Sequence, residues 1–294
     1  MNQTVAQDAF LEELENNRPA AALIAQQVGA ALAEDLGGGD RTAALLPADR
    51  ESRGELITRQ RMIPCGRAWF DEVFRQLDPG VHIEWWVADG DLVEQDRVLC
   101  GLTGSTRALL SGERTAMNYL QTLSGTASRA RSYADAVAGL PVRLLDTRKT
   151  LPGLRVQQKY AVRCGGCYNH RMGLFDAILI KENHILAAGS ISAALKAAFE
   201  VADGLPVEIE VEGLDDLEEA LAAGATHLLL DNFDLDRLRR AVTLVAGKAR
   251  LEASGGVTLD NVRDIAETGV DDISVGDLTK DLVSIDLSMR FVDT

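Results

Sequence analysis

Positive charge is concentrated between Asp146 and His184, in a chain that is otherwise acidic. This segment holds seven Arg or Lys residues and two of the four His residues against three acids, while the whole chain carries a formal net charge of −15. Guanidinium and ammonium groups bind carboxylates and phosphates through charge-assisted hydrogen bonds. A basic segment in an acidic protein therefore predicts a site for a small polyanion.

The cations of this segment do not follow one helix, as those of a solvated helix face would. Arg148 and Lys149 come directly after the apolar run LLDT, and Lys181 ends the apolar run AILIK. Two separate strand ends can thus bring cations to one place, which favours a binding site.

Cys164, Cys167 and His170 are spaced as part of a zinc or redox site would be. A structural zinc site has four such ligands, and the sequence offers no second pair nearby. With Cys65 and Cys100 the chain has four cysteines in 294 residues, which is too few for a disulfide framework. We therefore expect reduced, packed thiols and no zinc.

Composition excludes several classes of protein. The apolar fraction of 46% and the charged fraction of 26% are those of a soluble globular protein. The net charge of −15 argues against nucleic acid or an anionic membrane as the main partner. Residues 1–17 have neither a basic start nor a long apolar run, so the sequence predicts no signal peptide and a cytoplasmic protein.

From about Arg143, short apolar runs alternate with amphipathic segments of helix length. The runs are 143–147, 177–181, 207–211, 227–231, 250–254 and 272–276, and the clearest helices are 214–223 and 235–246. Gly224 and Gly247 follow these helices as stop signals. Repeated strand–helix units predict an α/β protein with a parallel sheet, and their succession predicts a (β/α) barrel, complete or with fewer than eight strands.

The run at 207–211 indicates which side of the barrel carries chemistry. Glu208, Glu210 and Glu212 alternate with apolar residues, although both faces of a parallel strand are normally apolar. Inward carboxylates require a cationic partner, either a metal or Lys and Arg from neighbouring strands. Barrel active sites lie at the carboxyl ends of the strands, so one mouth can hold several polar residues. These are Arg148, Lys181, Glu210, Asp231, Ser254 and Ser274.

The last two runs end in glycine-containing loops, Ser254–Gly256 (SGG) and Ser274–Gly276 (SVG). Glycines directly after strands let backbone N–H groups approach an anion. Phosphate sites of barrel enzymes commonly use the last two such loops, so this pair predicts a phosphate site.

Residues before the barrel follow another pattern. The segments 55–66 and 81–104 are typical of strands, the second broken by a turn at Asp89–Gly90, and 67–77 and 106–123 are typical of helices. We expect a separate α+β domain of about 100 residues here.

Long, ordered motifs in this chain resemble those of quinolinate phosphoribosyltransferase. They include GERTAMNYLQTLSGTAS, LLDTRKTLPGLR, LIKENHI, EIEVEGLDDLEEAL, EASGG and ISVGDLTK, and the resemblance runs from about Glu34 to Phe291. It implies an enzyme of NAD biosynthesis. With magnesium, this enzyme would convert quinolinate and phosphoribosyl pyrophosphate into nicotinate mononucleotide, pyrophosphate and carbon dioxide.

The resemblance also implies an architecture. An N-terminal α/β sandwich domain would cover residues 1–124, with residues 285–294 returning to it, and a seven-stranded α/β barrel would cover 125–284. Two such chains would form a homodimer in which the N-terminal domain of one subunit closes the barrel mouth of the other. At Cys167–Tyr168 this chain departs from the small residues expected in many relatives.

Individual roles follow from the same resemblance. The residues placed against quinolinate are Arg148, His170, Arg171, Lys181 and the partner subunit's Arg114. The catalytic residues would be Lys181, Glu210 and Asp231, and the two acids would also serve magnesium and the ribose. The residues facing the rest of phosphoribosyl pyrophosphate would be Lys149, Ser254, Gly255, Gly256, Ser274 and Gly276.

Three other functions are open from the residues alone. Lys181 at a strand end suits the Schiff-base lysine of an aldolase. A relative of the same fold could act on nicotinate or another acceptor, although the number of cations favours a dicarboxylic one. The third alternative is a non-catalytic effector-binding protein, in which inward Glu210 and Asp231 would have no metal to serve.

Overall fold

The computed structural model describes residues 18–292, which form two compact units. The first unit comprises the described parts of residues 1–131, 156–166 and 282–294, and the second comprises 132–155 and 167–281. Residues 1–17, which carry the prediction about a signal peptide, lie outside the described residues.

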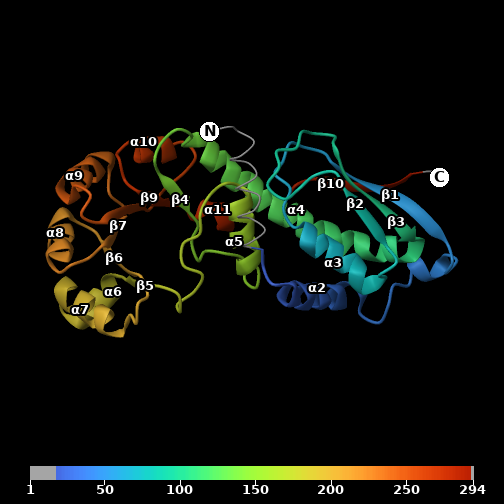
Figure 1. Cartoon of the computed structure of the whole chain (residues 1–294), viewed down its shortest axis with the longest axis horizontal. Helices are drawn as coiled ribbons and strands as arrows, with labels where there is room; N and C mark the ends of the chain where they lie inside the picture. The colour runs from blue at the N-terminus through green and yellow to red at the C-terminus, as the bar shows by residue number, and fades with distance from the viewer. Residues whose placement is uncertain (1–17, 293–294) are drawn as a thin grey trace. The chain divides into compact units, whose positions relative to one another are not determined.

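The first unit is built on a four-stranded antiparallel sheet in the order β10-β1-β3-β2. Its strands are β1 (Glu51–Thr58), β2 (His82–Trp85), β3 (Val98–Ser105) and β10 (Leu287–Val292). Its helical segments are α2 (Ala21–Leu36), η1 (Ala43–Leu45), α3 (Arg67–Leu77), α4 (Thr106–Ala136, to Arg131 in this unit) and α5 (Arg155–Cys164, from Val156). Figure 1 shows α3 and α4 beside the sheet, which the C-terminal strand completes.

Helix α3 shows how the sequence builds the core of this unit. Its buried residues Trp69, Phe70, Val73 and Phe74 recur at helical spacing on one face. The half-buried Asp89 carboxylate accepts the backbone N–H groups of Gly66 and Arg67, at 3.2 and 3.3 Å. A side chain from another segment thus satisfies N–H groups at the start of the helix, where no helical partner exists.

Helix α4 is longer than the sequence predicts. The helix expected over 106–123 continues to Ala136. The helix continues through Gly125, where the missing side chain lets the backbone of Val283 come close. A Cβ at this position would lie 2.3 Å from the carbonyl oxygen of Val283.

The second unit contains a parallel sheet in the order β4-β9-β8-β7-β6-β5. Its strands are β4 (Arg143–Leu145), β5 (Ile178–Ile180), β6 (Val207–Val211), β7 (His227–Asp231), β8 (Arg250–Ser254) and β9 (Asp272–Ser274). Its own helices are α6 (Glu182–Ala188), α7 (Ile191–Val201), α8 (Leu214–Ala222), α9 (Leu235–Val245), α10 (Val262–Ala266) and α11 (Asp277–Lys280). Each predicted run contains one strand, and Figure 1 shows α7 to α10 outside the curved sheet.

Where the resemblance implies seven strands, the described part of this sheet has six strands and one isolated bridge. Tyr168 forms a parallel bridge with Leu145, beside the edge strand β4. Its N–H donates to the carbonyl of Leu144 at 2.8 Å, and its carbonyl accepts the N–H of Asp146 at 3.0 Å. The Arg143 guanidinium lies 5.8 Å from the centre of the Tyr168 ring, so this large residue packs on the sheet edge.

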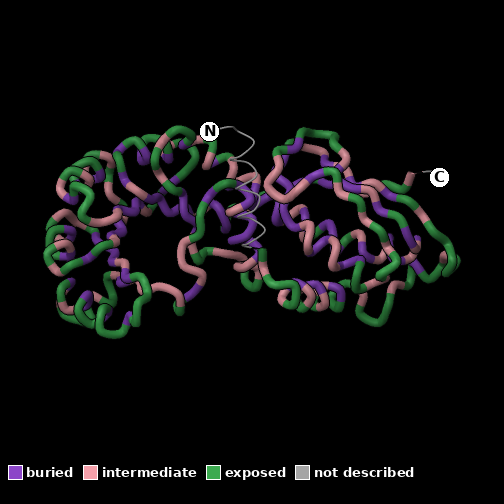
Figure 2. The backbone as a smooth tube through the Cα atoms, viewed as in Figure 1, coloured by how far each residue is buried: buried purple, intermediate pink, exposed green. Residues whose placement is uncertain are grey.

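Strand β6 alternates as predicted. Val207, Ile209 and Val211 are buried, while Glu208 and Glu210 point to the opposite side of the strand. In the second unit, Figure 2 shows mainly buried residues along the strands and many exposed residues on the outer helices. Among the described helices, none alone is long and apolar enough to cross a membrane. Helices α6 and α7 are long and apolar enough only when taken together, and this pair is bent by 95°.

Candidate active site

An ion pair joins the carboxyl ends of β5 and β6. Lys181 directly follows β5, and its Nζ lies 2.5 Å from Oε2 of Glu210, which is only 8% exposed. The expectation that inward carboxylates meet a cation from a neighbouring strand is confirmed here. An ammonium held by a buried carboxylate differs from the neutral amine that a Schiff-base lysine needs, which argues against the aldolase alternative.

Two further cations of the second unit, Arg148 and Arg171, lie close enough to each other to interact through their charges. Arg148 is exposed three residues beyond β4, and the half-buried Arg171 donates from Nη1 to the carbonyl of Ala177 at 3.1 Å. Burial and the like charge of Arg148 lower the pKa of Arg171, against the opposing influence of Glu208 and Asp176. Such a pair of cations is stabilised by an anion.

His170 lies on the inner side of the sheet, between carboxylates of two strands. Its Nε2 is 3.0 Å from Oε2 of Glu208 on β6 and 3.5 Å from Oε2 of Glu252 on β8. Its backbone N–H donates to the buried Asp146 carboxylate at 2.9 Å, and the Asn169 amide donates to the same carboxylate at 2.6 Å. Asp146 thus holds the chain that follows the Tyr168 bridge.

Glu252 is the most perturbed acid of this cluster. Burial, and then the negative charge of Glu208, raises the pKa of Glu252 to about 8. His170 and the Ser274 hydroxyl act in the opposite direction and lower the pKa of Glu252. Its Oε1 is buried and makes no hydrogen bond within the described part of the chain. Glu252 and Glu208 line a cavity of about 340 Å³, together with His170 and Arg171.

The two loops that follow β4 and β9 are joined by Lys149. A Cβ on Gly276 would lie 3.3 Å from Cδ and 3.8 Å from Nζ of Lys149, so the lysine side chain crosses the glycine. The carbonyl of Lys149 accepts the Thr279 hydroxyl at 2.8 Å. A cation therefore lies beside the predicted phosphate loop that contains Gly276.

The ends of β7 and β8 form the neighbouring loop pair. Asp231 is the register partner of Ser254, and one of its oxygens accepts the Asn232 amide at 2.7 Å. Gly255 has a φ of +97°, and a Cβ there would lie 2.1 Å from Oδ1 of Asn232. The SGG sequence is thus required by backbone conformation and by close approach. Gly256 also has a positive φ, +61°.

Not all predicted residues come together in one unit. Arg114 is exposed on α4 in the first unit, whereas the other proposed site residues belong to the second. Cys164 belongs to the first unit, and Cys167 and His170 to the second. All four cysteines are buried and reduced.

Sequence reasoning gave no role to Glu252, Asn169 or Asn232. Glu252 could have been found, because it alternates with Arg250 and Ser254 and so shares their inward face. Asn169 and Asn232 act through short contacts with Asp146 and Asp231, which spacing alone does not reveal.

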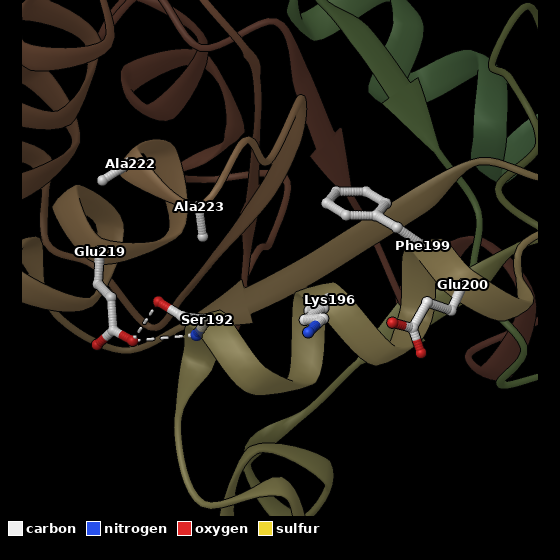
Figure 3. Close-up of a pocket in the computed structure, with 7 residues that line it drawn as sticks. All are labelled: Ser192, Lys196, Phe199, Glu200, Glu219, Ala222 and Ala223. Carbon is white, nitrogen blue, oxygen red and sulfur yellow. Dashed lines mark hydrogen bonds between the residues drawn. The ribbon is translucent and has the colours of Figure 1, made fainter.

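A groove of about 590 Å³ lies elsewhere in the second unit, between α7 and α8. Figure 3 shows Lys196 and Phe199 along α7, and the Ser192 hydroxyl and N–H donating to Glu219 of α8. None of the predicted site residues lines it.

Comparison with known proteins agrees with this arrangement. Residues 40–124 and 126–290 match the families described as quinolinate phosphoribosyl transferase, N-terminal domain and C-terminal domain. The Bacillus subtilis protein named "Probable nicotinate-nucleotide pyrophosphorylase (carboxylating)" is 41% identical over 87% of this chain and 89% of its own length. The Nicotiana glauca protein named "Quinolinate phosphoribosyltransferase (decarboxylating) 2, mitochondrial" is 38% identical over 90% and 80%.

A solved structure is similar over nearly the whole chain. The nicotinate-nucleotide pyrophosphorylase from Francisella tularensis superposes with a TM-score of 0.92 and 43% identity, covering 94% of this chain and 98% of that one. The matches to the N-terminal and C-terminal domain families follow each other along the chain and together cover most of the sequence. By its two domains and its fold, the chain belongs to the quinolinate phosphoribosyltransferase family.

Proposed function

We propose that this chain transfers the phosphoribosyl group of phosphoribosyl pyrophosphate to quinolinate, with loss of carbon dioxide, to give nicotinate mononucleotide and pyrophosphate in NAD biosynthesis. Membership of the family and the names of the relatives support this reaction. The observation that carries it is the proximity of Arg148 and Arg171. Burial of Arg171 and the like charge of Arg148 lower the pKa of Arg171. Two carboxylates on one ring relieve that repulsion better than one.

The acceptor binds through its two carboxylates to Arg148, Arg171 and Lys181. Guanidinium groups suit planar carboxylates, and Lys181 is held at the carboxyl end of β5 by Glu210. The partner subunit's Arg114 adds a further cation. The donor's 5′-phosphate lies against the SGG and SVG loops, where Gly255 adopts a conformation closed to most other residues.

Ribosyl transfer breaks the bond between ribose C1 and pyrophosphate while the ring nitrogen of quinolinate bonds to C1. Positive charge develops on the ribose, and the carboxylates of Glu210 and Asp231 stabilise it. Their oxygens are also the ligands that Mg²⁺ prefers, so these two residues would hold the ion, directly or through water. When bound, magnesium neutralises the negative charge of the departing pyrophosphate.

Decarboxylation follows from the first step. The ribosylated nitrogen is cationic, so the carbon beside it can keep the electron pair when its carboxylate leaves as carbon dioxide. That carbon then takes up a proton. No protein nucleophile is required, and positioning and charge account for most of the rate.

The proposal includes a cytoplasmic homodimer with shared sites. Arg114 is exposed and belongs to the first unit, apart from the residues proposed to bind the acceptor. This is compatible with a donation of Arg114 to the site of a second chain, as the family resemblance implies.

A release assay tests substrate, donor and metal together. Quinolinate labelled in the carboxylate beside the ring nitrogen is incubated with the full chain, phosphoribosyl pyrophosphate and Mg²⁺. We expect labelled carbon dioxide, dependent on both the donor and the metal, and little or no reaction of nicotinate. Faster turnover of nicotinate than of quinolinate would overturn the proposal.

A further inference from the structure

The two ring nitrogens of His170 both have partners inside the second unit. Nδ1 accepts the backbone N–H of Arg171 at 2.7 Å, and Nε2 lies 3.0 Å from Oε2 of Glu208. A backbone N–H can only donate, so Nδ1 must carry a lone pair there, and the ring proton lies on Nε2. The main chain and Glu208 therefore select one tautomer of the imidazole.

This tautomer fixes the backbone that carries Arg171. The His170 N–H is bound by Asp146 at 2.9 Å, and the next N–H is bound by the ring itself. Glu208 holds the far side of the ring, and Glu252 lies 3.5 Å from the same nitrogen. Consecutive N–H groups are thus fixed by a buried carboxylate and an oriented ring, directly beside the Arg171 side chain.

We propose that Glu208, with Glu252 beside it, is a positioning residue that holds His170 as the Nε2–H tautomer and thereby orients Arg171 toward the acceptor's carboxylate. This inference rests on the proposed function. It assigns His170 an indirect role, because its nitrogens are committed to Glu208 and to the Arg171 backbone, and it assigns Glu208 an effect on the acceptor but little on the donor.

The same three side chains could also be taken for a metal site. The ligand atoms of His170, Glu208 and Glu252 all lie within 4.8 Å of one another, and one imidazole with two carboxylates suits a divalent transition metal. A metal would take the lone pair of Nε2 and move the ring proton to Nδ1. That proton would then face the Arg171 N–H across 2.7 Å, so the geometry favours the positioning role.

The first test reads the tautomer without any turnover. The full chain has four His residues, and labelling their ring nitrogens with ¹⁵N allows His170 to be assigned from the signal lost in His170→Gln. We expect a protonated Nε2 and an unprotonated Nδ1 in the protein without substrates. An Nδ1–H tautomer, an imidazolium, or stoichiometric divalent metal in the purified protein would overturn the proposal.

The second test separates acceptor from donor. Glu208→Leu removes the hydrogen-bond acceptor and should raise the KM for quinolinate about 10- to 100-fold, as loss of an orienting partner does elsewhere. The KM for phosphoribosyl pyrophosphate and kcat should change far less, and Glu208→Gln, which keeps an oxygen at the same position, should recover part of the loss. The exposed Glu218→Leu on α8 is the control, with wild-type values expected.

The two proposals fail in different ways. A wild-type chain that releases no carbon dioxide from quinolinate contradicts the proposed reaction, while the nitrogen spectrum still decides the tautomer. An unchanged KM for quinolinate in Glu208→Leu contradicts the positioning role alone. If the leucine variant does not fold, the nitrogen spectra of wild type and Glu208→Gln decide. We expect the Nε2–H tautomer of His170 in both proteins, and an Nδ1–H tautomer in either would contradict the positioning role.

Discussion

At the scale of single residues, the side chains of the second unit are set by the charges that face them. Lys181 forms an ion pair with Glu210 at 2.5 Å, Arg171 experiences the like charge of Arg148, and Glu252 is buried beside Glu208. Each of these arrangements is costly in isolation, because like charges repel and buried charges lose solvation. Of these arrangements, the proximity of Arg148 and Arg171 is the one that an anionic ligand would stabilise.

Lys181 is the residue whose loss should be most specific. Lys181→Met should lower kcat/KM for quinolinate by at least about 100-fold, because it removes a cation from the proposed acceptor site and the partner of Glu210. Steady-state kinetics with both substrates measure this, and circular dichroism checks the fold. Lys196→Met, an exposed lysine in the groove of Figure 3, is the matched control and should behave as wild type. Full activity of Lys181→Met would exclude the assigned role.

Glu252 should make stability depend on pH. Burial raises its pKa from 4.5 to about 8, so between these values the unfolded chain releases a proton that the folded chain keeps. The free energy of unfolding of wild type therefore falls as pH rises through this window, and levels off above it. Glu252→Gln has no such proton, so its stability relative to wild type should rise from pH 5 to pH 8.

Each pKa unit corresponds to about 1.4 kcal/mol, so this relative gain is on the order of a few kcal/mol. Urea unfolding at several pH values measures it, with the exposed Glu218→Gln as a control. A constant difference between Glu252→Gln and wild type across the window would mean that Glu252 is ionised in the folded chain.

At the scale of elements, the site depends on loops that directly follow parallel strands. The loops after β4 and β9 are joined by the contact of Lys149 with Gly276, and those after β7 and β8 by Asn232 and Gly255. Short strands backed by buried apolar faces fix where these loops begin. Backbone conformation then decides which groups a phosphate can approach.

Two glycine substitutions separate strain from contact. Gly255→Ala should raise the KM for phosphoribosyl pyrophosphate by at least about 10-fold, because the new Cβ would lie 2.1 Å from Oδ1 of Asn232 and would disturb the loop proposed to bind phosphate through its backbone. Gly247→Ala also places alanine at positive φ, +76°, but no atom lies within 4 Å of its Cβ. It should cost about 1 kcal/mol of stability and leave both KM values unchanged. Equal kinetic effects of the two would remove Gly255 from the donor site.

At the scale of the whole molecule, the proposed site draws on two units that carry different residues. Lys181 and its neighbours belong to the second unit, and Arg114 belongs to the first. Each unit has its own sheet, antiparallel in the first and parallel in the second. The question at this scale is which chain supplies Arg114 to a given site.

A mixing experiment answers it. Arg114→Ala and Lys181→Ala proteins should each be nearly inactive, yet regain about one quarter of wild-type activity after random subunit exchange, since about half of the dimers are mixed and each has one intact site of two. Native mass spectrometry confirms the exchange, and mixing each variant with itself is the control. Demonstrated exchange without recovery would place Arg114 in the site of its own chain, or outside any site.

The sequence by itself determined much of this protein, because local pattern follows from local physics. Alternation in VEIEV fixed which side chains share the inner face of β6, and the repeated strand–helix rhythm predicted the parallel sheet. The basic segment also predicted a site for an anion from charge alone.

Only the tertiary structure decided the partners. The sequence predicted a helix over 106–123, whereas α4 continues to Ala136, and Gly125 within it allows a close approach of Val283, which is distant in sequence. In the same way, Glu252 lies beside Glu208 and His170, which come from separate segments, and burial together with the charge of Glu208 raises the pKa of Glu252. Periodicity reports the face on which a side chain lies. Which charges meet there depends on strand register and loop paths, and these follow from packing over the whole unit.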